Sequence, residues 1–142
     1  DTGEPLSFMS ANLLSAARTG AVPGVAARHL ARKDSEVITV LGCGQINRSC
    51  LRSILTQLPY VKKVVCFDIF EAAAQKFLEW EKEELGVDGV VELDLEAALK
   101  DADVITVAAS RLKPLYVKDE WMKDRLKMEV GEWSAYEWID MG

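Results

Sequence analysis

The chain has 142 residues, of which 49% are apolar and 28% charged, and its formal net charge is −6 at pH 7. This length and balance are typical of a globular domain and exclude a disordered chain. The acidic charge argues against a nucleic-acid partner, and without an apolar run of roughly 18 residues or a signal-peptide pattern we expect neither a membrane partner nor export.

The N-terminal segment is predicted to be helical, because apolar residues led by Leu13 and Leu14 recur at helical spacing. Pro23 interrupts this pattern, and proline fits the first turn of a helix better than its interior. We therefore expect two helices, at about residues 10–19 and 23–32.

From residue 35 onward, short apolar runs alternate with amphipathic segments. The run at 36–41 is largely apolar and β-branched, which is typical of a strand buried on both faces. Such alternation indicates a parallel sheet with right-handed crossovers. We predict an α/β fold, a Rossmann-type doubly wound parallel sheet with strand order 3-2-1-4, preceded by an N-terminal helical segment. The expected strands are 36–41, 63–67, 89–91 and 103–107, and the expected helices between them are 45–57, 70–85 and 94–101.

The first predicted strand runs directly into a glycine-rich turn and then into a helix. The N–H groups and the positive end of a helix suit a pyrophosphate, so the pattern predicts a bound nucleotide. Gly42 permits the tight turn, and Gly44 lets the backbone approach the phosphates. The third position of the G-x-G-x-x-G pattern is Asn47, which predicts a slightly wider approach of helix to strand. The residues expected to contact the cofactor here are Gly42, Cys43, Gly44, Gln45 and Ile46.

An acidic residue, Asp68, follows the second predicted strand, where a carboxylate accepts hydrogen bonds from the adenosine ribose hydroxyls. It would repel a 2′-phosphate, and the next basic residue is Lys76, so we expect NAD rather than NADP. Ser110, just past the fourth strand, is placed to line the same cleft, although an ordinary loop serine fits equally well. The alternative is the same fold without a nucleotide, in which the glycines form a tight turn and Asp68 caps a strand.

The three cysteines, Cys43, Cys50 and Cys66, form an odd set without metal-ligand spacing. Free cysteines of this kind fit a reducing compartment, so we expect a cytoplasmic protein and no metal site. Cys43 is then simply a small residue of the turn. His29, the single histidine, lies among alanines and a leucine, and we do not expect it to be catalytic.

A more specific pattern joins Arg18-Thr19-Gly20-Ala21 to a helix that ends in Leu30-Ala31-Arg32 before the first strand. Together with Thr2-Gly3-Glu4-Pro5-Leu6, these segments resemble the ornithine cyclodeaminase/mu-crystallin family over about residues 2–124. The resemblance implies that Arg18 binds a substrate carboxylate near the cofactor phosphates, a role suited to a guanidinium. An arginine that pairs with a surface acid is the simpler alternative. Thr19 would bond a phosphate or close the helix.

The same resemblance implies hydride transfer on an amino acid or a cyclic imine, in a homo-oligomer. Residues 1–34 would be a helical lead-in from the substrate and dimerisation domain, 35–124 the dinucleotide-binding domain, and 125–142 an aromatic, acidic tail. Family enzymes also use a lysine and a second arginine from a region before the segment at 2–6, and an aspartate from a strand after the fourth.

The catalytic set is therefore incomplete in this sequence, and whether the chain is an enzyme stays open. The sequence after Trp121 departs from the family pattern, so neither Asp124 nor Asp140 is assigned as the catalytic aspartate. Two alternatives remain. One is a non-catalytic nucleotide-binding module, and the other is an interaction domain whose tail recruits a partner through the aromatic residues Trp133, Tyr136 and Trp138.

Overall fold

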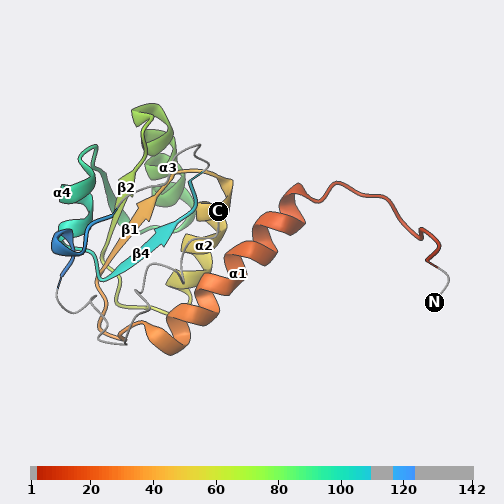
Figure 1. Cartoon of the computed structure of the whole chain (residues 1–142), viewed down its shortest axis with the longest axis horizontal. Helices are drawn as coiled ribbons and strands as arrows, with labels where there is room; N and C mark the ends of the chain where they lie inside the picture. Colours follow the sequence, from red (N-terminus) through yellow and green to blue (C-terminus); the bar gives the residue numbers. More distant parts are fainter. Residues whose placement is uncertain (1–2, 110–116, 124–142) are drawn as a thin grey trace.

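A computed structural model of the chain describes residues 3–109 and 117–123. An extended N-terminal segment leads into a long helix, after which strands and helices alternate (Figure 1). Among the described residues, no helix is long and apolar enough to cross a membrane. The elements are α1 (Asn12–Leu30), β1 (Val37–Leu41), α2 (Gln45–Leu55), β2 (Lys63–Phe67), α3 (Glu71–Glu84), β3 (Asp88–Val91), α4 (Leu95–Lys100), β4 (Val104–Val107) and the 3-10 helix η1 (Asp119–Trp121).

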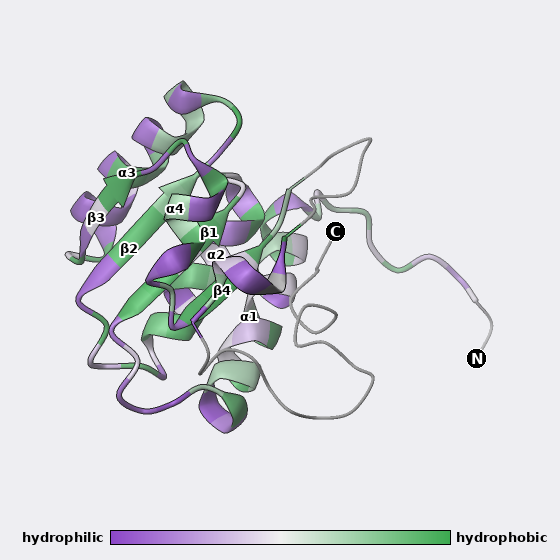
Figure 2. Ribbon diagram, turned by 60° about the vertical axis from the view of Figure 1, so that its left-hand side comes forward, coloured by the Kyte–Doolittle hydropathy of each residue, from purple (hydrophilic) through white to green (hydrophobic). Residues whose placement is uncertain are grey.

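The four strands form one parallel sheet in the order β3-β2-β1-β4, which confirms the predicted α/β fold. β1 lies inside the sheet, where Val40 pairs with Cys66 of β2 on one side and with Thr106 of β4 on the other. Strands β1, β2 and β4 are largely apolar, whereas the helices that surround them carry both polar and apolar residues (Figure 2). Because the strands are parallel, the carboxyl ends of β1, β2 and β4 meet at one end of the sheet, beside the first residues of α2.

The N-terminal helix corrects the prediction of two helices, because α1 runs unbroken through Pro23. An internal proline removes a backbone hydrogen bond and costs about 3 kcal/mol. Packing against α2 compensates for it. Pro23 is buried, an added Cβ at Gly24 would lie 2.9 Å from the Ser53 Cβ, and the Ser53 hydroxyl donates to the Gly20 carbonyl oxygen. Tertiary contact thus keeps a helix continuous where local propensity would interrupt it.

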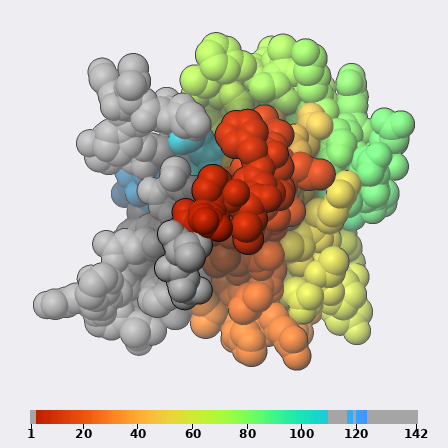
Figure 3. Space-filling model, turned by 90° about the vertical axis from the view of Figure 1, so that its right-hand side faces the viewer, coloured from red at the N-terminus to blue at the C-terminus, as the bar shows by residue number. Residues whose placement is uncertain are grey.

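The buried face of α1 consists of small residues. Leu13 and Leu14, whose spacing helped to predict the helix, are 76% and 63% exposed. α1 lies so close to α2 that only small side chains fit between them, and the leucines stay outside. The segment that precedes α1 projects from the side of the molecule on which α1 lies (Figure 3). The residues buried on α1 are Ala16, Thr19, Gly20, Pro23, Gly24 and Ala27.

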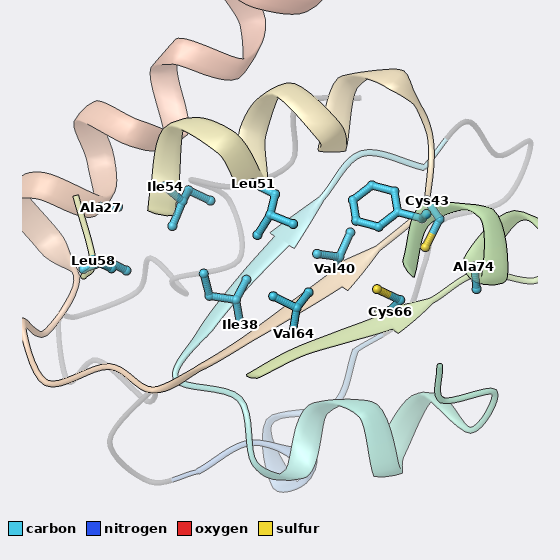
Figure 4. Packing of buried hydrophobic residues seen from close by; sticks show 11 residues of the cluster. Ala27, Ile38, Val40, Cys43, Leu51, Ile54, Leu58, Val64, Cys66 and Ala74 are labelled. Atoms are coloured by element: carbon cyan, nitrogen blue, oxygen red, sulfur yellow. The ribbon is translucent and has the colours of Figure 1, made fainter. Parts of the chain in front are cut away.

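The main core lies between the sheet and the helices α2 and α3 (Figure 4). Ile38 and Val40 of β1 lie beneath Leu51 of α2, and all three are fully buried. Burying side chains of this size contributes about 1.5–3 kcal/mol each. On the opposite face, Thr39 is equally buried, and its hydroxyl donates to the carbonyl oxygen of Ala98 in α4 at 2.7 Å. β1 is therefore buried on both faces, as its sequence predicts.

We expect Gly20→Ala to lower the free energy of unfolding by about 1–3 kcal/mol, because the new methyl group would overlap Ser49 of α2. On an exposed helix face the same change stabilises by roughly 0.5–1 kcal/mol, so the sign of the effect is informative. Urea unfolding followed by circular dichroism measures it. Val22→Ala, on the exposed side of α1, is the control and should change stability by less than about 0.5 kcal/mol. Unchanged stability in Gly20→Ala would contradict the close contact.

Candidate functional site at the turn between β1 and α2

The turn after β1 begins with a glycine that the fold requires. Gly42 has a φ of +90°, a conformation that L side chains rarely adopt. An added Cβ would also lie 2.6 Å from the carbonyl oxygen of Ala108, just past β4. The Gly42 N–H donates to the carbonyl oxygen of Phe67 at 2.9 Å, which ties the turn to β2. This glycine is therefore explained by the packing of the chain itself.

Gly44 is different, because nothing in the fold requires a glycine there. Its φ of −96° is open to any residue, and no atom lies within 4 Å of an added Cβ. The residue is exposed at the N-cap of α2, where no side chain caps the helix and the first turn contains no acidic residue. The turn therefore leaves open the positive end of an 11-residue helix, a place that suits an anionic group.

Asp68 follows β2 and bonds directly to this turn. Its Oδ2 accepts a hydrogen bond from the Cys43 N–H at 2.7 Å, and its Oδ1 accepts one from the Phe70 N–H at 2.9 Å. The structure thus brings together the two segments that the sequence singled out. Each carboxylate oxygen has a second lone pair, and the side chain is only half-buried, so it can still accept hydrogen bonds from hydroxyl groups of a ligand.

The other residues predicted for the turn lie around these two positions. Cys43 is buried, and its thiol donates to the Phe67 carbonyl oxygen at 3.6 Å. Gln45 is exposed and Ile46 is half-buried at the start of α2. Ser110 lies outside the described residues.

Two contacts fix how α1 lies along α2. An added Cβ at Gly20 would meet Ser49, and one at Gly24, a turn later, would meet Ser53, also a turn later. The two helices therefore run side by side in the same direction. By the same spacing, the residues one turn before Gly20 are level with the beginning of α2.

Arg18 and Thr19 lie on this stretch of α1, beside the first turns of α2. Arg18 is exposed, whereas Thr19 is buried at 8% exposure. Thr19 does not close the helix, because α1 continues to Leu30. His29 is exposed in the last turn of α1, beyond the end of α2 that is distant from the glycine turn.

Asn47 has a role in the turn that sequence reasoning missed. The residue is fully buried, and its Nδ2 donates to the carbonyl oxygens of Leu41 at 2.9 Å and Gly42 at 2.7 Å. Its Oδ1 accepts a hydrogen bond from the Thr106 hydroxyl at 2.8 Å. From the glycine pattern, only the size of this side chain enters the prediction. The available signal was a short polar residue in the first helical turn, where such side chains bond to the backbone.

A buried acid lies on α3, next to Cys66 of β2. Glu81 of α3 is fully buried, its Oε2 accepts a hydrogen bond from the Cys66 thiol at 3.9 Å, and its Oε1 has no hydrogen-bond partner among the described residues. Burial, assisted by the Asp88 carboxylate, raises the pKa of Glu81 to about 7. The adjacent Cys43 thiol and burial raise the pKa of Cys66, so that thiol stays protonated and available as a donor.

Known proteins share this sequence and geometry. The sequence profile of the ornithine cyclodeaminase/mu-crystallin family matches residues 1–130. N-((2S)-2-amino-2-carboxyethyl)-L-glutamate dehydrogenase of Staphylococcus aureus is 29% identical over 124 residues, which are 87% of this chain and 37% of that protein. Alanine dehydrogenase of Archaeoglobus fulgidus is 36% identical over 127 residues, again 87% of this chain and 37% of the relative.

Solved structures agree with these matches. The Delta(1)-pyrroline-2-carboxylate reductase of Thermococcus litoralis, solved with NADH and L-proline, superposes with a TM-score of 0.79 and 33% identity over 85% of this chain and 37% of the other. An archaeal alanine dehydrogenase dimer with bound NAD gives a TM-score of 0.74 and 36% identity over 85% and 36%. The chain thus spans little more than a third of the length of these relatives.

We expect the free energy of unfolding to fall as the pH rises, because of Glu81. The folded chain holds this proton more tightly than the unfolded chain, so the stability it contributes is present below pH 4.5 and is lost as the pH rises through about 7. The loss between about pH 5.5 and about pH 8.5 amounts to about 2 kcal/mol in urea titrations. In Glu81→Gln this pH dependence should disappear, and an identical slope in both proteins would contradict the assignment.

Proposed function

Because the chain belongs to the ornithine cyclodeaminase/mu-crystallin family, we propose that it is the dinucleotide-binding part of an NAD-dependent oxidoreductase or lyase. The enzyme acts by hydride transfer on an amino acid or a cyclic imine, as a homo-oligomer. The relatives named alanine dehydrogenase and Delta(1)-pyrroline-2-carboxylate reductase support this substrate class. In this proposal residues 35–124 bind the cofactor, 1–34 lead in from the substrate and dimerisation domain, and 125–142 form a tail.

The open space at Gly44 is the observation that carries the proposal. A glycine that the fold does not need, at the uncapped start of α2, keeps the backbone N–H groups of the turn accessible to a pyrophosphate. A glycine that served only the fold would have a positive φ or neighbouring atoms where its Cβ would lie, and Gly42 has both. The donor set of the turn, which consists of backbone N–H groups without a nearby acid on the helix, fits the two phosphates.

Asp68 supplies the ribose contact in this proposal. The turn already holds its carboxylate in place, and its remaining lone pairs accept the ribose hydroxyls. The same charge, followed by the exposed residues Ile69, Phe70 and Glu71, disfavours the additional phosphate of NADP. The relatives solved with NADH, NAD or NAD+ support NAD as the cofactor.

Arg18 and Thr19 serve the substrate and phosphate side of the site. The exposed guanidinium of Arg18 is a planar fork that matches a substrate carboxylate, and Thr19 bonds a phosphate. When bound, the nicotinamide gives or takes the hydride. The three cysteines are all free and buried, which supports the cytoplasm as the compartment of the enzyme.

We expect the chain to bind NADH with saturation in isothermal titration calorimetry. Gly44→Val should abolish this binding, because the branched side chain fills the space above the start of α2. It should lower the melting temperature only slightly, because no atom lies within 4 Å of the new Cβ and valine is merely a poorer N-cap than glycine. Gly42→Ala is the matched contrast and should lower the melting temperature. The absence of NADH and NADPH binding to the unmodified chain at millimolar concentration would refute the proposal.

Asp68→Asn should reduce the preference for NADH over NADPH by about tenfold, because hydrogen bonds to a charged acceptor contribute about 1.5–3 kcal/mol. The amide keeps the size of the side chain and one acceptor oxygen, so the turn keeps part of its support. Parallel titrations with both cofactors measure the ratio of dissociation constants. Glu71→Gln, the next acid along the chain, is the control and should change the ratio less. An unchanged ratio in Asp68→Asn would show that this carboxylate does not select the cofactor.

A further inference from the structure

We propose that Asn47 is a positioning residue for the cofactor: it fixes the orientation of the peptide between Gly42 and Cys43, and with it the backbone donors of the turn. The side chain is fully buried, so it acts through the backbone rather than by contact with the ligand. This inference rests on the proposed NAD site and deepens it, because it names what holds that site in a binding-competent shape.

The chemistry of its neighbours fixes which way the Asn47 amide faces. The carbonyl oxygens of Leu41 and Gly42 can only accept hydrogen bonds, so the NH2 group must face both of them. The amide oxygen is then left for the Thr106 hydroxyl, which can donate. One side chain on α2 thereby joins the end of β1, the first residue of the turn and β4.

The peptide between Gly42 and Cys43 is held at both edges. Its carbonyl oxygen accepts from Asn47 Nδ2 at 2.7 Å, and its N–H donates to Asp68 Oδ2 at 2.7 Å. Because the peptide unit is planar, two hydrogen bonds on opposite edges fix its rotation. The direction in which the backbone continues into Gly44 is fixed with it.

The restraint matters because the turn contains two glycines, which give the backbone unusual freedom. The familiar pattern would place a third glycine at position 47. Here the buried amide stands instead and restrains the freedom that the glycines of the turn allow. Asn47→Gly would complete the pattern, yet it would remove a hydrogen-bond partner from both the Gly42 carbonyl and the Thr106 hydroxyl. Pattern and structure therefore predict opposite effects of the same substitution.

The first experiment measures NADH affinity by calorimetry for the unmodified chain, Asn47→Gly and Thr106→Val. Apparent affinity falls with the fraction of chains whose turn is competent to bind, so we expect about a tenfold higher Kd for Asn47→Gly. Thr106→Val removes only the anchor of the amide oxygen and should raise the Kd by about threefold. Ile54→Val trims the core on the same helix and is the control, with a lower melting temperature but an unchanged Kd.

The second experiment measures amide hydrogen exchange in the ligand-free chain. In Asn47→Gly the Cys43 N–H should exchange faster, while the Val40 N–H in β1 changes no more than in Ile54→Val. A merely structural role would accelerate both together and would overturn the inference. So would an unchanged Kd in Asn47→Gly or, if that variant does not fold, in Thr106→Val. If the unmodified chain does not bind NADH, the proposed function fails, and the exchange rates still decide whether Asn47 restrains the turn.

Discussion

At the carboxyl end of β1 the backbone passes so close to Ala108 that position 42 has no room for a Cβ. This contact sets how the ends of the central strands meet, and the candidate site is arranged around it. Asp68 reaches the turn from β2, and Asn47 reaches across to Thr106 on β4. A side chain at Gly42 would disturb both of these contacts at once, because a close-packed interior transmits strain to its neighbours. The shape of the turn is therefore determined by the sheet as much as by its own residues.

A second close approach, between α1 and α2, connects the N-terminal segment to the same frame. The small residues Gly20 and Gly24 let α1 pack directly against α2, and the Ser53 hydroxyl donates to the Gly20 carbonyl oxygen. Arg18 is carried by this helix, whereas the glycine turn is the entry to α2. The residue proposed for the substrate therefore lies on α1 and the residues proposed for the cofactor lie at the start of α2, so a shift of α1 along α2 would move one set relative to the other.

The sequence predicted the sheet because its signals are local. An apolar β-branched run identifies β1, and strict alternation of strands and helices implies the strand order and the meeting of Asp68 with the turn. The error concerns a residue whose state depends on a distant partner. Pro23 stays inside a helix because α2 packs against it. The hydrogen bonds of Asn47 reach β4, which no local pattern encodes.

The two glycines of the turn differ in what requires them. At position 42 the neighbouring backbone occupies the space of a side chain, whereas at position 44 a side chain would enter open space. A library of variants sorted only for folded, soluble protein would reject side chains at 42 and accept a wide range at 44. Sorted for ligand capture, the same library would reject them at both. Stability-guided redesign of this domain would therefore treat residue 44 as free to vary, although its missing side chain leaves the space that we propose for the nucleotide.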